Sequence, residues 1–399
     1  MVSIKKLTAI LFSASVLLLA CSPSNESTPD ENNETMAEEK TEETIITPVV
    51  EDTEEKVSFF GVGDNLIHSQ IIEFAQTEED VFDFKPIYQN IADDIQEADL
   101  SFINQESIIG GDNLGFTGYP SFNTPSDMAE NLVDLGFNII GGSNNHSLDC
   151  GTAGVNNTLN YWEEYKDDAL FTGVFDSQES RDTIATIEVD DVTFSVLTYT
   201  YGTNGIAPEY PYLVNYFDPE LITEDVKKAK EVSDFVIVSA HWGDEHALAP
   251  NQMQLDYAKL FADLEVDLVV GTHSHTIQPV EWVTGKNGNE TLVIYSLGNF
   301  VASTTSDINM LGGSIYLDFI RGEEESYIDN VKFVPLVIHY ETAVEGDIDT
   351  RTDFEIFKLN EYSEEIANKH ALNNFEDNEV HPAVYEGIVH EVIDAEFLE

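Results

Sequence analysis

The stretch Asp267-Leu268-Val269-Val270-Gly271-Thr272-His273-Ser274-His275 joins an apolar run to a turn that carries two histidines. The apolar run predicts a short buried strand, which the glycine ends. In open α/β sheets ligands bind at the carboxyl ends of the strands, where these two imidazoles lie. Two histidines at this spacing can reach one metal ion or two adjacent ions. Two solvent-facing loop histidines would show the same pattern.

Four more predicted strand ends carry polar clusters of the same kind. Carboxylate, amide and imidazole groups together suit Zn, Mn, Fe or similar divalent metals. Their number exceeds the four ligands of a closed structural zinc site. The sequence therefore predicts a two-metal site with a bridging oxygen ligand. The four clusters are Gly63-Asp64-Asn65-Leu66-Ile67-His68, Asn104-Gln105-Glu106, Gly142-Ser143-Asn144-Asn145-His146 with Asp149, and His241-Trp242-Gly243-Asp244-Glu245.

Predicted strands and helices alternate between these clusters. This alternation predicts a largely parallel sheet, and the strand-rich part that follows predicts a second, mixed sheet packed against it. Helices are expected at 86–98, 126–135 with Ser126 as N-cap, 155–165, 224–232 and 252–264, the last with Leu255, Leu260, Phe261 and Leu264 on its apolar face. Strands are expected at 57–63, 100–103, 137–140, 235–240, 268–270, 280–283, 291–295, 314–319 and 331–339, with a hairpin of 183–189 and 193–199 across Asp190-Asp191.

The two ends of the chain differ from this middle part. Lys5 and Lys6 precede an apolar stretch, 7–20, of signal-peptide length that ends at Cys21. Residues 1–21 resemble a bacterial lipoprotein signal, in which the cysteine becomes the lipidated first residue. An ordinary secretory signal with an incidental cysteine is the alternative.

Acidic segments of low apolar content are expected on both sides of the folded part. Residues 22–55 are rich in Ser, Thr, Asn, Pro and Glu, which predicts a disordered spacer between the membrane and the domain. Residues 346–399 are expected to form an acidic C-terminal extension with a peripheral helix. The second cysteine, Cys150, has no predicted disulfide partner.

The charge of the chain excludes some partners. Seventeen basic residues against 76 acidic ones give a formal net charge of −59. Such a chain is repelled by nucleic acid and by anionic lipid surfaces, so no nucleic-acid partner is expected. The charge is spread along the chain, which indicates a salty or alkaline surrounding. The only arginines are Arg181, Arg321 and Arg351, and this scarcity argues against an arginine clamp for phosphate or carboxylate.

Together with Ser296-Leu297-Gly298-Asn299-Phe300, the ordered motifs resemble those of the metallophosphoesterase (calcineurin-like) superfamily. They resemble more closely its CapA branch, the capsule or poly-γ-glutamate synthesis proteins. The resemblance covers roughly residues 57–320. It implies a metallophosphatase-like, four-layer α/β/β/α sandwich of two mixed sheets for the domain at residues 56–345. It also implies a role in capsule or polyglutamate production.

The resemblance assigns the ligands of the first metal. Asp64 resembles one of them. The superfamily pattern has a histidine two residues later, where this chain has Leu66. His68 is the only nearby imidazole, and it either substitutes as a ligand or lines the pocket. Glu106 stands where most of the superfamily has an aspartate that bridges both metals, and its longer side chain allows a different intermetal geometry.

The remaining ligands come from three later motifs. Asn145, His241 and His273 resemble ligands of the second metal, and His275 resembles the ligand that returns to the first metal. His273 and His275 are therefore expected to diverge, one toward each ion, beside Glu106. Two divalent ions (Mn, Zn or Fe) are the implied cofactors.

His146 resembles the non-ligand imidazole that faces the substrate, as general acid or charge stabiliser. Asp149 is placed to accept its other N–H and so fix the tautomer. Two hypotheses follow. The first is a lipid-anchored, metal-dependent hydrolase on the extracellular face of the membrane, acting on a phosphoester or on the γ-linked amide of an anionic polymer. The second is a non-catalytic polymer-binding or assembly component of a capsule-synthesis membrane complex.

Neighbouring residues have plainer expectations. Asn144 is expected to shape its turn, and 296–300 to turn the backbone beside the metals. Trp242 is expected either to stack on a substrate group or to pack. The loop 244–246 either lines the cleft or is solvated. The other four histidines, His339, His370, His381 and His390, are expected to be surface or core residues.

Overall fold

The computed structural model describes residues 54–323 and 325–398. The expected signal peptide 1–21, Cys21 and nearly all of the spacer 22–55 therefore lie outside the described residues. Strand β1 (Glu55–Asn65) begins where the sequence predicts the folded part to begin. No helix in the described part of the chain is long and apolar enough to span a bilayer.

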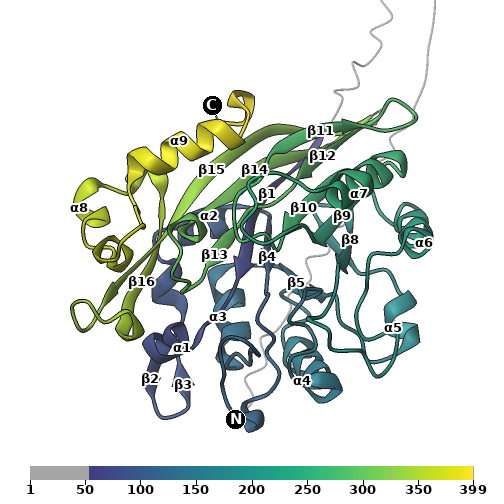
Figure 1. The fold of residues 1–399 in the computed structure, drawn as a ribbon. Coiled ribbons are helices and arrows are strands. Elements are labelled where there is room, and N and C mark those ends of the chain that lie inside the picture. The colour runs from purple at the N-terminus through teal and green to yellow at the C-terminus, as the bar shows by residue number, and fades with distance from the viewer. Residues whose placement is uncertain (1–53, 324, 399) are drawn as a thin grey trace, which may run out of the picture. The chain divides into compact units, whose positions relative to one another are not determined.

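The first sheet is mixed and has eight strands (Figure 1). Its order is β16-β15-β14-β1-β4-β5-β6, with β13 (Asn299–Val301) paired to the end of β1. The parallel strands are β1, β4 (Leu100–Asn104), β5 (Ile139–Gly141) and β6 (Leu170–Thr172). The antiparallel strands are β14 (Leu311–Arg321), β15 (Ser326–Thr342) and β16 (Arg351–Lys358).

The second sheet is also mixed, with the order β11-β12-β10-β9-β8-β7. Its four parallel strands are β8 (Val192–Thr200), β9 (Phe235–His241), β10 (Leu268–Thr272) and β12 (Glu290–Ile294). Antiparallel edges are formed by β7 (Thr186–Val189) and β11 (Val280–Thr284). The expected hairpin across Asp190-Asp191 is confirmed, and both aspartates adopt positive φ, as a tight hairpin turn requires.

The alternation of side chains along the strands packs the two sheets face to face. In β9, Phe235 and Ile237 point toward the first sheet, whereas Val236 and Val238 point away. The Phe319 ring of β14 lies with its centroid 4.9 Å from that of Phe235. Each inner strand therefore contributes apolar side chains to two separate cores.

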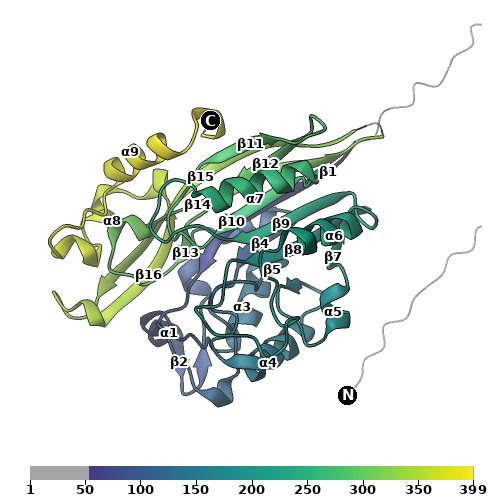
Figure 2. The same ribbon diagram turned by 45° about the vertical axis from the view of Figure 1, so that its right-hand side comes forward.

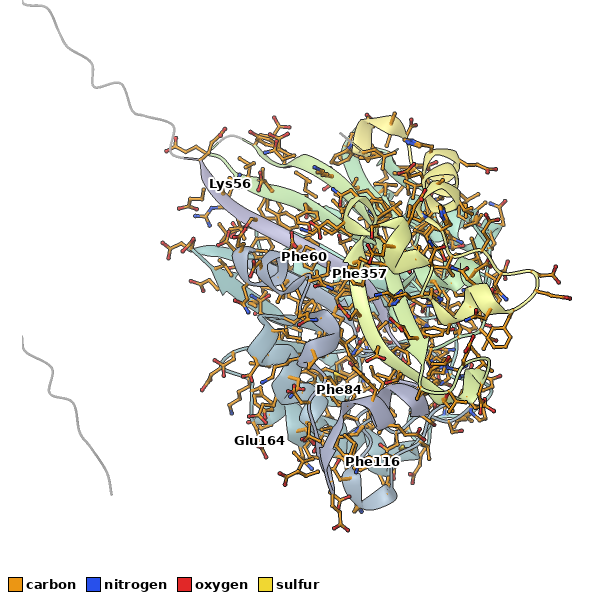
Figure 3. All side chains as sticks on the ribbon, turned by 90° about the vertical axis from the view of Figure 1, so that its left-hand side faces the viewer. Lys56, Phe60, Phe84, Phe116, Glu164 and Phe357 are labelled. Carbon is orange, nitrogen blue, oxygen red and sulfur yellow. The ribbon has the colours of Figure 1, made fainter. Side chains whose placement is uncertain are left out.

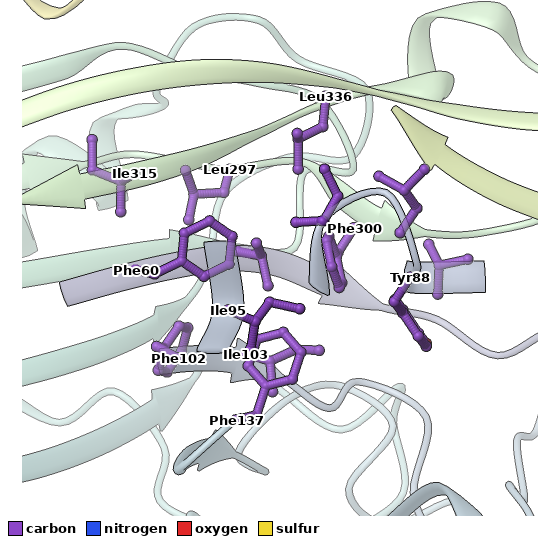
Figure 4. Packing of buried hydrophobic residues seen from close by; sticks show 14 of the residues in the cluster. Phe60, Tyr88, Ile95, Phe102, Ile103, Phe137, Leu297, Phe300, Ile315 and Leu336 are labelled. Atoms are coloured by element: carbon purple, nitrogen blue, oxygen red, sulfur yellow. The ribbon is translucent and has the colours of Figure 1, made fainter. Parts of the chain in front are cut away.

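Helices cover both outer faces. α6 (Pro219–Ala229) and α7 (Gln252–Asp263) cover the second sheet (Figure 2). On the first sheet, Ile95 of α2 (Ala92–Glu97) lies near Ile103 and Phe137 (Figure 4). The predicted four-layer α/β/β/α sandwich is confirmed. The remaining helices are α1 (Ser69–Ala75), α3 (Asp127–Leu135), α4 (Gly151–Glu163), α5 (Gln178–Asp182), α8 (Glu364–Ala367) and α9 (Pro382–Val392).

Three local predictions were wrong in whole or in part. The expected helix 86–98 is a short 3-10 helix (Lys85–Tyr88) followed by α2, since the backbone N–H groups of Ile87 and Ile91 donate to the carbonyls three residues earlier, those of Phe84 and Tyr88. Ser126 occupies the N-cap position of α3 as predicted, but its hydroxyl donates to Asp112 and makes no capping hydrogen bond. Leu255 is 40% exposed and so does not belong to the buried face of α7.

The C-terminal segment contributes more than a peripheral helix. Strand β16 pairs with β15 at the edge of the first sheet, and Phe354 and Ile356 are buried there. Figure 3 looks onto this side of the molecule and labels Phe357 on the same strand. The alternation of apolar and polar residues at 352–357 is the sequence signal for this strand. Strands β14 and β15 also extend the first sheet and not the second.

Candidate metal centre

The carboxyl ends of parallel strands from both sheets meet at one place. In the first sheet, Asp64 at the end of β1 lies in register with Asn104 at the end of β4. In the second sheet, His241 at the end of β9 lies in register with Thr272 at the end of β10. Because the parallel strands of both sheets end at this place, the five strand-end clusters come together there, as the sequence predicted.

Asp64 is fully buried and holds two of these segments together. Its Oδ1 accepts a hydrogen bond from Asn104 Nδ2 at 2.7 Å, and its Oδ2 accepts one from the backbone N–H of His273 at 3.0 Å. Oδ2 also lies 3.4 Å from His275 Nδ1. The carboxylate is thus fixed toward the turn that carries both histidines.

Glu106 lies at the middle of the cluster. Its two carboxylate oxygens lie 3.5 Å from His241 Nε2 and 3.8 Å from His275 Nδ1. One ligand atom each from Glu106, His273 and His275 lie within 4.8 Å of one another. Among the described residues, neither oxygen of Glu106 has a hydrogen-bond partner, although both are buried. Burial, and next the charge of Asp64, raise the pKa of Glu106 well above its ordinary value.

His241 and Asn145 place two atoms that can bind a metal ion next to each other. His241 Nε2 lies 3.0 Å from Asn145 Oδ1, while His241 Nδ1 lies 2.9 Å from Thr272 Oγ1. The threonine hydroxyl thereby orients the ring. Burial lowers the pKa of His241 well below its ordinary value, so the imidazole is neutral, as a metal ligand must be.

The histidine turn itself has an unusual backbone. His273 and His275 both adopt positive φ, at 94° and 58°. Such strain is concentrated at functional sites. His273 Nδ1 is buried and has no hydrogen-bond partner in the described part of the chain. Burial lowers the pKa of His273 to about 3.

His275 behaves differently from His273. Burial alone would lower its pKa, but the carboxylates of Glu106 and Asp64 outweigh burial and raise the pKa to about 10. Its Nδ1 lies 2.9 Å from Asn299 Oδ1. Asn299 therefore contacts the centre with its side chain, whereas the sequence predicted only a backbone role for 296–300.

His146 forms the predicted pair with Asp149. Its Nδ1 donates to Asp149 Oδ2 at 2.7 Å, and the same oxygen accepts the backbone N–H of Phe122. His146 lies next in sequence to Asn145, and the amide of Asn204 lies 3.3 Å from Asn145 Nδ2 and 3.4 Å from His146 Nδ1. The pair is therefore placed beside the cluster and held in one orientation.

His68 lies nearby but gives no atom to the cluster of Glu106, His273 and His275. Its Nδ1 lies 3.1 Å from the carbonyl oxygen of Leu66 and accepts from the Ser303 N–H at 3.3 Å. Both contacts are made by Nδ1 and leave Nε2 without a hydrogen bond among the described residues, so they fit either reading of His68, a ligand or a residue that lines the pocket.

Several neighbouring residues can now be assigned. Trp242 is fully buried and donates its indole N–H to the Tyr295 carbonyl, so it packs and does not stack on a ligand. Asn144 Oδ1 accepts the backbone N–H of His146, which confirms its turn role. His339 and His370 are core residues, as one of the two expectations had it.

The sequence missed four residues that touch the centre: Asn104, Thr272, Tyr201 and Asn204. Asn104 and Thr272 stand inside motifs that the sequence did single out, one or two residues from a predicted ligand. Tyr201, whose ring centroid lies 4.4 Å from that of His273, and Asn204 belong to a loop without any metal-ligand pattern. No sequence signal pointed to them.

These residues fit divalent metal ions. Imidazoles, amide oxygens and carboxylates converge, and three buried ligand atoms (both Glu106 oxygens and His273 Nδ1) have no hydrogen-bond partner among the described residues. Buried polar atoms without partners are rare and costly in proteins. The donor set suits Mn, Zn or Fe and does not choose among them.

Comparisons with known proteins give the same family as the motifs. A family model described as bacterial capsule synthesis protein PGA_cap matches residues 58–304. The PGA biosynthesis protein CapA of Bacillus subtilis (strain 168) is 31% identical over 180 residues, which cover 45% of this chain and 46% of that protein. The capsule biosynthesis protein CapA of Bacillus anthracis is 29% identical over 177 residues, 43% and 41% of the two chains. The matches thus span less than half the length of these relatives.

Two solved structures are similar in part. A structure described as a novel phosphatase from Mycoplasma pneumoniae covers 71% of this chain and 95% of its own, with a TM-score of 0.42 and 12% identity. A protein described as a 5′-nucleotidase of Staphylococcus aureus, in complex with α-ketoglutarate, covers 74% and 57%, with a TM-score of 0.45 and 16% identity. At these TM-scores the likeness carries no argument about function.

Proposed function

Because this chain belongs to the family of bacterial capsule synthesis proteins (PGA_cap), as its motifs predicted, we propose that it is a metal-dependent hydrolase of capsule or poly-γ-glutamate metabolism. Its substrate is a phosphoester or the γ-linked amide of an extracellular anionic polymer. One observation carries the proposal. The carboxylate of Glu106 is buried without a hydrogen-bond partner among the described residues, and it faces the imidazoles of His241 and His275.

The proposed ligands form two sets, one for each metal ion. Asp64, Glu106 and His275 would hold the first ion, while Glu106, Asn145, His241 and His273 would hold the second. Support comes from the 3.0 Å separation of Asn145 Oδ1 and His241 Nε2 and from the 3.4 Å separation of Asp64 Oδ2 and His275 Nδ1. Bound divalent metals supply Lewis acidity and an activated water at near-neutral pH.

His146 acts as the general acid in this proposal. Asp149 accepts the Nδ1–H of His146, which fixes the tautomer and leaves Nε2 to carry the proton for the leaving oxygen or nitrogen. Asp149 is held in turn by the backbone N–H of Phe122. The near-complete burial of His146 excludes bulk water from this proton.

Turnover by purified protein tests the proposal. With Mn or Zn present, an aryl phosphodiester and γ-polyglutamate are offered to the wild type, to His146→Ala and to the control His390→Ala, which changes an exposed histidine of α9. Hydrolysis of either substrate by the wild type and control, with a loss of about 100-fold or more in His146→Ala, is expected. Metal binding without turnover of either substrate would instead favour the non-catalytic assembly role.

The anchoring of the protein is a separate part of the proposal. The basic residues Lys5 and Lys6, the apolar stretch 7–20 and Cys21 support a lipid anchor on the extracellular face of the membrane, where a capsule-synthesis complex and its polymer would be within reach. Labelling of the chain by a radioactive fatty acid in cells, and loss of the label in Cys21→Ser, is the expected result. Equal labelling of both chains would contradict it.

A further inference from the structure

The three arginines of the chain are bonded in different ways. Arg181 pairs with Asp225 at 2.6 Å, and Arg321 pairs with Asp234 at 3.1 Å. Within residues 54–323 and 325–398, Arg351 has no ion-pair partner, and its buried Nε and Nη1 atoms have no hydrogen-bond partner. In a chain with 76 acidic residues, a guanidinium that meets no carboxylate requires an explanation.

Arg351 lies at the start of β16 and is linked to His68 through Tyr340 and the segment 303–304. Its guanidinium carbon lies 6.0 Å from the ring centroid of Tyr340, whose hydroxyl donates to the carbonyl oxygen of Thr304. The preceding residue, Ser303, donates its N–H to His68 Nδ1. Thr304 Oγ1 is a further buried polar atom without a partner among the described residues. Arg351 and Thr304 therefore both contact Tyr340, and both keep buried polar atoms without a partner among the described residues.

A series of contacts extends from His68 to the general acid. The Phe122 ring lies edge-on to both imidazoles, with centroid separations of 5.3 Å from His68 and 4.6 Å from His146. The contacts of Arg351 with Tyr340, of Tyr340 with Thr304 and of Ser303 with His68 place Arg351 on the His68 side of the centre.

We propose that Arg351 binds a carboxylate or phosphate group of an anionic substrate whose scissile bond lies at the metal centre. The inference rests on the proposed hydrolase function. A guanidinium is a planar fork that binds such oxyanions through two parallel hydrogen bonds, so the proposal departs from the expectation, based on the scarcity of arginine, that the chain has no arginine clamp. The acidic chain as a whole repels anions, so a buried guanidinium without a carboxylate partner among the described residues favours one place for the anionic group. Arg351 lies outside the family-matched residues 58–304.

Nuclear magnetic resonance of the arginine side chains tests the anion site directly. A chain labelled with 15N-arginine gives three Nε–H signals, which Arg321→Gln and Arg351→Gln assign. The metal-free wild type is titrated with inorganic phosphate and, separately, with glutarate, at constant ionic strength. We expect the Arg351 signal alone to shift and to saturate with at least one anion, and the more effective anion identifies the group. An unmoved Arg351 signal, or an equal shift of Arg321, overturns the proposal.

Kinetics test the role in substrate binding. With any anionic substrate that the wild type hydrolyses, Arg351→Gln is expected to raise KM about tenfold or more and to change kcat less than threefold, because the arginine holds a group remote from the scissile bond. Arg351→Lys should restore part of the loss, and Arg321→Gln should leave KM unchanged. An unchanged KM in Arg351→Gln overturns the inference. If no substrate is hydrolysed, the hydrolase proposal fails, while the titration still decides whether Arg351 binds an anion.

Discussion

Two clusters of buried histidines lie in this molecule, and they are bonded in opposite ways. At the strand ends, His241, His273 and His275 surround a carboxylate that has no hydrogen-bond partner among the described residues. Beneath the C-terminal helices, His339 Nδ1 lies 2.7 Å from the Tyr362 hydroxyl and His370 Nε2 lies 3.2 Å from a backbone carbonyl. The histidines of both clusters are buried, so burial alone does not identify a metal site. Buried ligand atoms that lie beside carboxylates and have no hydrogen-bond partner do identify one.

The two clusters should therefore respond to substitution in opposite ways. A residue of the strand-end cluster is expected to affect metal binding more than the stability of the metal-free protein. A residue of the C-terminal cluster is expected to do the reverse. Four predictions follow this contrast, from the largest effect to the smallest.

Glu106→Gln should abolish tight metal binding. The amide keeps the shape of the side chain but removes the charge shared by both ions, and we expect affinity for Mn or Zn to fall about 100-fold or more. In chelator, the variant should be at least as stable as the wild type, because a buried, unpartnered carboxylate has been removed. Metal titration followed by calorimetry, with thermal melts in chelator, checks both parts. If Glu106→Gln lost stability in chelator but kept its metal affinity, the proposed difference between the two histidine clusters would be contradicted.

His370→Ala should destabilise the fold and leave metal binding unchanged. The substitution leaves the Leu372 N–H and the Ile338 carbonyl without their partner and opens a cavity, which costs about 3 kcal/mol. Denaturant unfolding of the metal-free protein gives the free energy, and metal analysis gives the content. A change of metal content in this variant would show that the two clusters are not independent.

Stability in chelator should fall as pH decreases from about 6.5. Burial lowers the pKa of His339 to about 4 and that of His370 to about 3. Below pH 6.5 these two histidines bind protons in the unfolded chain but not in the folded chain, so the contribution of this pair to stability is complete above this pH and is lost below it. Each histidine adds a slope of at most about 1.4 kcal/mol per pH unit. Denaturant unfolding at several pH values should show a shallower slope for His370→Gln than for the wild type, and identical slopes would contradict the assignment.

His68→Ala should have the smallest effect on metal binding. Because His68 gives no atom to the cluster of Glu106, His273 and His275, we expect unchanged metal content and an affinity within about tenfold of the wild type. The titration used for Glu106→Gln checks this prediction. Loss of one equivalent of metal would instead make His68 the ligand that replaces the family histidine missing at Leu66.

The parts of the fold that the sequence predicted are those with a strong local period. Buried strands such as Leu268–Thr272 were found because their apolar runs end at a glycine or a polar cluster. The 3-10 helix before α2 was missed because the buried residues Ile87, Ile91 and Ile95 have the spacing of one continuous helix. Strand β16 was missed because its alternation stands inside an acidic segment.

The candidate site was predictable where ligands follow strands. Asp64, Glu106, Asn145, His241, His273 and His275 each stand at or just after a strand end, and parallel pairing brings such positions together. Asn204 was not predictable, because a loop of no regular pattern brings its amide to His146. Arg351 was not predictable either, because the sequence does not show that its buried Nε and Nη1 atoms have no hydrogen-bond partner among the described residues.

The metal content of the purified protein, after growth with Mn and Zn, tests the central claim most directly. A dinuclear centre at Asp64, Glu106, Asn145, His241, His273 and His275 predicts two equivalents of transition metal per chain, and less than one in Glu106→Gln. Less than one equivalent in the wild type, or the same content in both proteins, would contradict the account.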